Sequence, residues 1–136
     1  NAKDRKINNI EYFCSNATSF KTTEKFNFIF ISGLLLYLSN KDIKRMVSSI
    51  LKYSNKSTRL VLREPTGTKG QYTIIDEYSE SLNESYSAIY RTRQELISIF
   101  EEIGFFLDMD DDMFQNGSPL NKWEETRLRL YLFTMR

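Results

Sequence analysis

Histidine is absent from the 136-residue chain, and cysteine occurs only once, at Cys14. A chain without histidine cannot form a Ser-His-Asp triad or a Cys-His dyad. It also lacks the usual ligands of a Cys/His zinc site, and one cysteine allows no intrachain disulfide. The sequence therefore predicts no metal site. Cys14 fits a buried small apolar residue in a reducing compartment, for which we expect the cytoplasm.

Long apolar runs and a surplus of charge are missing as well. The apolar stretch from Phe28 to Leu38 is too short to span a bilayer, and the sequence shows no secretory signal. Lysine and arginine number 19 against 18 acidic residues, and this net charge of +1 provides little for binding phosphates. We expect neither a membrane nor a nucleic acid as a partner, and residues 1–136 fit a single domain.

Two buried strands end in polar residues. The segment Phe26–Ser32 is apolar on both faces, as in a parallel sheet, and continues through Gly33 into an apolar helical segment. The strand Arg59–Arg63 is followed by Glu64, and we expect Pro65 to stop its ladder. Ligands collect at the carboxyl ends of strands in open α/β sheets, so these two strand ends form the candidate site.

Periodicity and capping predict the other elements. The first half contains a short strand at Asn8–Cys14, a helix from Asn40 and a loop at Tyr53–Thr58. An irregular connection at Thr66–Ser87 leads to a helix that is capped by Thr92 and ended by Gly104. The chain closes with a strand at 105–108, a loop at 110–112 and an alternating strand at 126–134 near a sheet edge. Strands that alternate with helices indicate an α/β sheet, and the final alternating strand is its antiparallel member.

Glycine is scarce and comes late in the chain. All five glycines lie at position 33 or beyond, and none forms the GxGxxG turn that holds phosphates in nucleotide-binding sheets. Such a sheet normally opens with a strand, a glycine-rich turn and a helix. We therefore expect the phosphate-holding half to be missing from this chain.

Three segments carry a resemblance to a known family: Ile10–Ala17, Phe26–Leu38 and Leu60–Pro65. Together with the closing order of helix, strand and strand, they resemble the carboxyl-terminal portion of class I S-adenosylmethionine-dependent methyltransferases. The resemblance implies a partial Rossmann-like sheet that lacks the first strand and the Gly-rich loop. It also implies S-adenosylmethionine as cofactor, and methyl transfer to an O or N nucleophile of a small molecule or a protein amino terminus.

The resemblance also assigns roles to residues. On the cofactor side it places Asn16, Ala17, Ser32, Gly33 and Tyr37, and on the acceptor side Arg63, Tyr78, Tyr86, Tyr90 and Arg91. The family has an acidic residue where this chain has Asn16, whose side-chain oxygen can still accept from an adenine amino group. Glu64 matches a catalytic position. Because the reactive methyl group is carried on a sulfonium, catalysis is mostly alignment, and Glu64 would orient the acceptor.

For these residues the sequence leaves other interpretations open. Glu64 could be a salt-bridged loop carboxylate, and Arg63 could pair with an acidic residue of the following loop (Glu77, Glu80 or Glu84). The tyrosines could belong to the core, although we expect at least one to face the cleft. The acidic run 110–112 is more typical of a solvated turn than of a calcium loop, and Trp123 of a packed loop.

The functional class also has alternatives. The chain could be a non-catalytic binding or scaffolding subunit, or a degenerate methyltransferase half that a partner completes; a different nucleotide-binding enzyme is a weaker option. A sheet without its first strands would expose an edge and apolar faces. We therefore expect a homo-oligomer, or completion by another chain segment.

Overall fold

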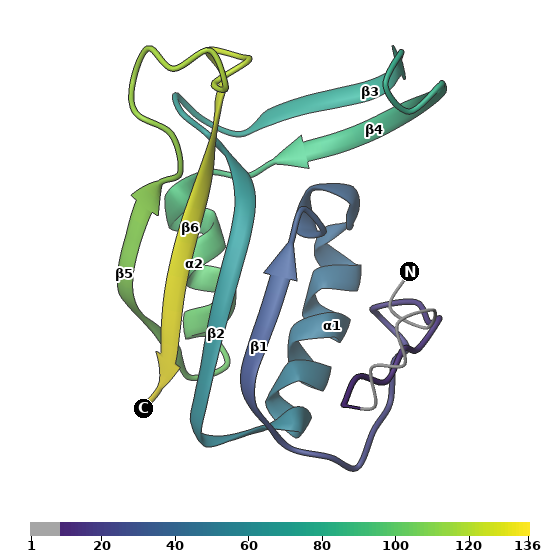
Figure 1. Cartoon of the computed structure of the whole chain (residues 1–136), viewed down its shortest axis with the longest axis vertical. Coiled ribbons are helices and arrows are strands. Elements are labelled where there is room, and N and C mark those ends of the chain that lie inside the picture. Colours follow the sequence, from purple (N-terminus) through teal and green to yellow (C-terminus); the bar gives the residue numbers. More distant parts are fainter. Residues whose placement is uncertain (1–8) are drawn as a thin grey trace.

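The computed structural model describes residues 9–136. Its elements are, in chain order, β1 (Phe26–Ser32), the short 3-10 helix η2 (Leu35–Tyr37), α1 (Asn40–Tyr53), β2 (Ser54–Gly67), β3 (Tyr72–Ser79), β4 (Glu84–Tyr90), α2 (Arg93–Glu101), β5 (Phe105–Asp112) and β6 (Thr126–Met135). Figure 1 shows a central sheet with a separate hairpin, β3–β4, at the end where β1 stops.

The sheet has four strands in the order β1-β2-β6-β5 (Figure 1). β1 pairs in parallel with β2, and β6 runs antiparallel to both of its neighbours, β2 and β5. The predicted α/β sheet with an antiparallel final strand is therefore confirmed. This strand lies one position in from the edge of the sheet, because β5 pairs along its outer side and is itself the edge strand.

Both helices cover one face of the sheet (Figure 1). α1 begins where the Ser39 side chain accepts a hydrogen bond from the Asp42 N–H, and its buried residues recur at helical spacing: Ile43, Met46, Val47 and Ile50. α2 begins with the predicted capping box between Thr92 and Glu95. The core between these helices and the sheet also contains Leu60, Leu62, Phe100 and Phe133.

The opposite face of the sheet has no helix over it within residues 9–136. Large apolar side chains lie exposed there, with 61% exposure at Phe28, 55% at Phe30 and 59% at Met109. Register places Phe30 beside Val61, and Val61 beside Leu132, on this same face. An apolar sheet face is normally buried by a second layer, so this fold shows one layer of helices where two would be usual.

Two segments predicted as loops are strands. The connection 66–87 contains the hairpin of β3 and β4, and its turn includes Asn83 at a φ of 52°, a conformation that asparagine tolerates. The acidic run 110–112 continues β5, because Arg93 and Arg129 bind the carboxylate of Asp110. Paired charges thus allow a strand where the sequence suggested a solvated turn.

Three other boundaries also differ from expectation. Residues 9–14 form no strand, since no neighbouring strand pairs with them, and Asn8 lies outside the described residues. β2 already begins at Ser54, within the predicted loop, and continues past Pro65 to Gly67. β1 ends opposite Arg63, so beyond that point β2 has a free side, where a proline is tolerated. Within 9–136, neither helix has the length and apolarity to cross a membrane.

Candidate functional site

The carboxyl ends of β1 and β2 lie side by side, as the sequence predicted. The Gly33 N–H donates to the carbonyl of Arg63 over 2.9 Å, which joins the end of one strand to the other. Gly33 then turns the chain into η2 at a φ of +57°, a conformation that side chains with a Cβ rarely adopt. The two strand ends therefore share one edge, and η2 lies directly above it.

Glu64 holds the start of this turn. One carboxylate oxygen accepts from the Leu34 N–H at 3.2 Å, and the other accepts from the Leu36 N–H at 2.7 Å. The residue is only 1% exposed. These amides stand at the amino end of η2, where backbone N–H groups have no partner within the helix. Glu64 therefore caps the turn from a neighbouring strand.

The environment of Glu64 opposes its ionisation. Burial raises the pKa of Glu64 to about 7, and this effect outweighs the backbone N–H groups and the Arg91 charge, which lower it. The carboxyl group therefore changes its charge close to neutral pH while in contact with the turn.

Arg91 holds the other end of the same turn. Its guanidinium donates to the carbonyl oxygens of Leu35 and Leu38 at 2.8 and 2.9 Å, and to the side-chain oxygen of Asn40 at 2.8 Å. Arg91 is 3% exposed. Desolvation lowers its pKa, against the charges of Glu95 and Glu64. The Glu64 carboxylate thus binds backbone N–H groups at one end of η2, and the Arg91 guanidinium binds backbone carbonyls at the other.

These contacts bear on two sequence expectations. Arg91, expected on the acceptor side, directs its guanidinium at backbone carbonyls inside the protein. Glu64, expected to orient an acceptor, instead contacts the turn that follows β1, and its role toward an acceptor stays a prediction. Sequence reasoning missed this pairing because the bonded residues are 28 to 56 positions apart.

The cofactor-side residues fall into two places. Ser32, Gly33 and Tyr37 lie together at the end of β1, where Arg63 donates to the Ser32 hydroxyl at 3.2 Å. Asn16 instead lies in a turn of its own, with its side-chain oxygen accepting from the N–H and hydroxyl of Thr18. Ala17 is in the same turn and packs against the core cluster to which α1 contributes. No strand forms at 9–14, so sheet pairing does not bring this turn to Gly33.

A pocket of about 350 Å³ lies between the hairpin and the loop before β6. The three predicted acceptor-side tyrosines, Tyr78, Tyr86 and Tyr90, all line it. Two more aromatic residues join them: Tyr72, which the sequence did not single out, and Trp123, which was expected to pack the loop before the last strand. Burial raises the pKa of Tyr90, with a further contribution from its hydrogen bond to Tyr86. The aromatic and β-branched residues from Tyr72 to Ile75 were the available signal for this hairpin.

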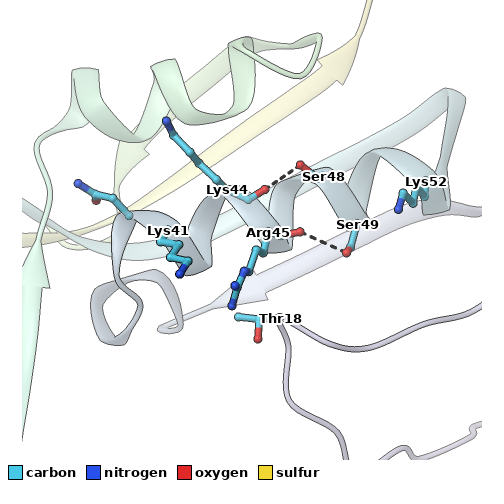
Figure 2. A pocket seen from close by; sticks show the side chains of 8 residues that line it. Thr18, Lys41, Lys44, Arg45, Ser48, Ser49 and Lys52 are labelled. Atoms are coloured by element: carbon cyan, nitrogen blue, oxygen red, sulfur yellow. Dashed lines mark hydrogen bonds between the residues drawn. The ribbon is translucent and has the colours of Figure 1, made fainter.

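A second, shallower hollow of about 740 Å³ runs along the outer face of α1. Figure 2 shows its basic side chains: Lys41, Lys44, Arg45 and Lys52. The hydroxyls of Ser48 and Ser49 donate back to carbonyls of their own helix (Figure 2). This hollow is the solvated face of an amphipathic helix.

Acidic residues form no metal centre in the described part of the chain, where no group of three or more His, Cys, Asp or Glu side chains gathers. The most closely held carboxylate, Asp110, is bound by Arg93 at 2.7 Å and also by Arg129. The Arg93 hydrogen bond is the main cause that lowers the pKa of Asp110 to about 2. These arginines already supply the charge that a cation would bring.

The sequence matches no family model and no curated protein, whereas many solved structures share the fold. A 1,6-didemethyltoxoflavin N1-methyltransferase from Burkholderia thailandensis, with bound S-adenosylhomocysteine, aligns with a TM-score of 0.73 at 9% identity over 98% of this chain and 54% of its own. The glycopeptide N-methyltransferase MtfA, complexed with S-adenosylmethionine, aligns with a TM-score of 0.63 at 12% identity over 90% and 59%.

The chain thus spans somewhat more than half the length of these methyltransferases. A pericyclic reaction enzyme also aligns, with a TM-score of 0.63 at 12% identity over 96% of this chain and 31% of its own. One fold therefore serves more than one chemistry, and likeness at this identity establishes architecture alone. The parallel pair β1–β2, the antiparallel β6 and these alignments together show that the chain has a partial class I, Rossmann-like fold of the S-adenosylmethionine-dependent methyltransferases.

Proposed function

We propose that this chain forms the acceptor-side half of an S-adenosylmethionine-dependent methyltransferase that acts on an O or N nucleophile of a small molecule or peptide. The observation that supports it best is the meeting of the Gly33 turn and the tyrosine-lined hairpin at one sheet edge. β4 packs on η2 (Figure 1), and the pKa of Tyr90 is affected by Tyr37, which lies on that turn. A methyl donor and its acceptor must be held together in this way.

The residues at the strand end fit part of the cofactor. A Cβ placed on Gly33 would meet no atom within 4 Å, and Tyr37 is 52% exposed, so open surface remains beside the turn. Ser32, Gly33 and Tyr37 would hold the methionine portion. Residues 9–136 contain no glycine-rich turn that could bind another part of the cofactor. When bound, S-adenosylmethionine supplies an electrophilic methyl group on a sulfonium.

In this proposal the chain's own residues align the reactants. Glu64 and Arg91 fix the turn that carries Tyr37, so the open surface beside Gly33 keeps one shape. The hairpin tyrosines would contact the acceptor and exclude water from it. Arg63, which reaches Ser32, would stand between the two. Glu64 would orient the acceptor indirectly, by holding the turn.

The test is an NMR titration of amide resonances with S-adenosylhomocysteine. The proposal expects shifts at Ser32, Gly33 and Tyr37, with weak affinity because only part of the site is present. Unchanged amides at these residues would refute cofactor binding by this edge. Micromolar affinity would instead show that the chain holds the cofactor without a second half.

The alternative function is a binding or scaffolding subunit that another chain completes. The sheet face with Phe28 and Phe30, which no element of residues 9–136 covers, lies next to the edge strand β1 and favours association of this kind. Sedimentation at increasing concentration should show self-association. A strictly monomeric species that unfolds cooperatively would count against it.

A further inference from the structure

The hairpin pocket has the composition of a cation site. Five of its lining residues are aromatic: Tyr72, Tyr78, Tyr86, Tyr90 and Trp123. Among residues 9–136, the charged residues that line it are both acidic, Glu77 and Glu80. The hollow on α1 is the opposite case, with basic residues and no aromatic ring. Ring faces and carboxylates both attract positive charge.

The aromatic side chains come from two segments, the hairpin and the loop before β6. The rings of Tyr72 and Tyr90 stand 5.9 Å apart with 32° between their planes, on neighbouring strands of the hairpin. Trp123 comes from the loop before β6 and is 66% exposed, so much of its indole is free to contact a ligand. Tyr78 is held by a 2.6 Å hydrogen bond from its hydroxyl to the Asn83 side chain.

The two carboxylates are available to such a ligand. Among the described residues, no lysine or arginine forms an ion pair with Glu77 or Glu80, and both are exposed. The alternative in which Arg63 pairs with them is not seen, since the Arg63 guanidinium bonds to Ser32. A neutral apolar ligand would cover these charges without compensating them, which is costly.

We propose that this pocket binds an organic cation, an ammonium or alkylammonium group carried on a small apolar body. The inference rests on the proposed function in one respect, namely that the bound cation would be part of the methyl acceptor. The ligand class itself follows from the pocket. The aromatic side chains contact the apolar body of the ligand and its cationic group, while the carboxylates of Glu77 and Glu80 attract the positive charge.

The test uses a matched pair of ligands, choline and its neutral carbon isostere 3,3-dimethylbutan-1-ol. Trp123 is the only tryptophan of the chain, so its fluorescence reports on this pocket alone. We expect choline to change the emission in a saturable way. We expect the isostere to bind at least about tenfold more weakly, because it has the same shape without the charge.

Variants then test the side chains. Glu77→Gln combined with Glu80→Gln should weaken choline binding about tenfold. The control, Glu101→Gln with Glu102→Gln, removes the same charge from two exposed residues at the carboxyl end of α2 and should leave binding unchanged. Tyr86→Leu should weaken choline more than the isostere, since it removes a ring face and keeps an apolar surface.

Two results would overturn the proposal. One is equal affinity for choline and its isostere, which would make the pocket simply apolar. The other is the absence of any choline-dependent change, both in Trp123 fluorescence and in the amide resonances of Tyr72, Tyr86 and Tyr90. The S-adenosylhomocysteine titration instead follows the amide resonances of Ser32, Gly33 and Tyr37. Cofactor binding without choline binding would refute only the cation site. Choline binding without cofactor binding would refute only the proposed function.

Discussion

Two regions meet at the carboxyl edge of the sheet, and they are built differently. The first two residues of η2 are buried, with Leu35 at 0% and Leu36 at 6% exposure, and Glu64 and Arg91 bond the two ends of the turn. The β3–β4 hairpin beside it leaves large side chains in solvent, among them Ile75 at 73%. Buried hydrogen bonds from Glu64 and Arg91 fix the region that we assign to the cofactor. Exposed aromatic surface leaves the acceptor region free to adapt.

The largest expected effect tests the fixed region. Glu64→Ala should lower the free energy of unfolding by about 3–4 kcal/mol at pH 5. The substitution leaves the N–H groups of Leu34 and Leu36 without their hydrogen-bond acceptor and creates a cavity. Chemical denaturation followed by circular dichroism measures this. Glu77→Ala, the matched change in the hairpin, should cost less than about 0.5 kcal/mol. Equal costs at the two sites would remove the contrast between the regions.

The pH dependence of stability gives a sharper form of this test. The pKa of Glu64 is about 7 in the folded protein against 4.5 as the ordinary value, so between these pH values the folded state binds the proton more tightly. The stability from this group is complete below pH 4.5 and is lost as pH rises through 7. The loss should total about 3 kcal/mol.

Glu64→Gln isolates this contribution, since it removes the titration and keeps the shape of the side chain. The difference in unfolding free energy between the wild type and this variant should fall as the pH rises from 4.5 to 7.5. Asp110 titrates near pH 2, outside this window. A difference that stays constant with pH would show that the turn does not depend on the charge state of Glu64.

A smaller effect tests the carbonyl end of the turn. Arg91→Lys should cost about 2 kcal/mol, because an ammonium cannot bridge the carbonyls of Leu35 and Leu38 together with Asn40 as the planar guanidinium does. Denaturation midpoints measure the loss. Lys44→Gln on the exposed face of α1 is the control, with no measurable change expected. Full stability of Arg91→Lys would mean that a simple charge suffices there.

The smallest effect should come from the hairpin. Tyr78→Phe removes the hydroxyl that donates to Asn83, in a residue that is 62% exposed, so the unfolding free energy should change by less than about 0.5 kcal/mol. The amide resonances of Gly33 and Tyr37 should stay where they are. A large loss of stability would show that the hairpin is fixed as firmly as the turn.

The elements that the sequence predicted well are those with local causes. The start of α1 near Asn40, the apolar spacing of that helix and the cap at Thr92 have causes within a few residues, and all three occur in the structure. The alternation of 126–134 predicted β6 as a strand, but its place between β2 and β5 depends on pairing partners. The hairpin was missed because its turn residues stand within a polar run that also fits an irregular loop.

By itself, the sequence determined both helices, the presence of β1, β2, β5 and β6, that β1 and β2 are parallel neighbours, and that Gly33 and Glu64 belong to one edge. Only the tertiary structure decided what Glu64 and Arg91 bind, that one sheet face stays bare, and that five aromatic residues meet two carboxylates in the hairpin pocket. The physical reason is the sequence separation of the residues that interact. Periodicity and caps involve residues a few positions apart, whereas the partners of Glu64 and Arg91 lie tens of residues away and are set by how the chain packs.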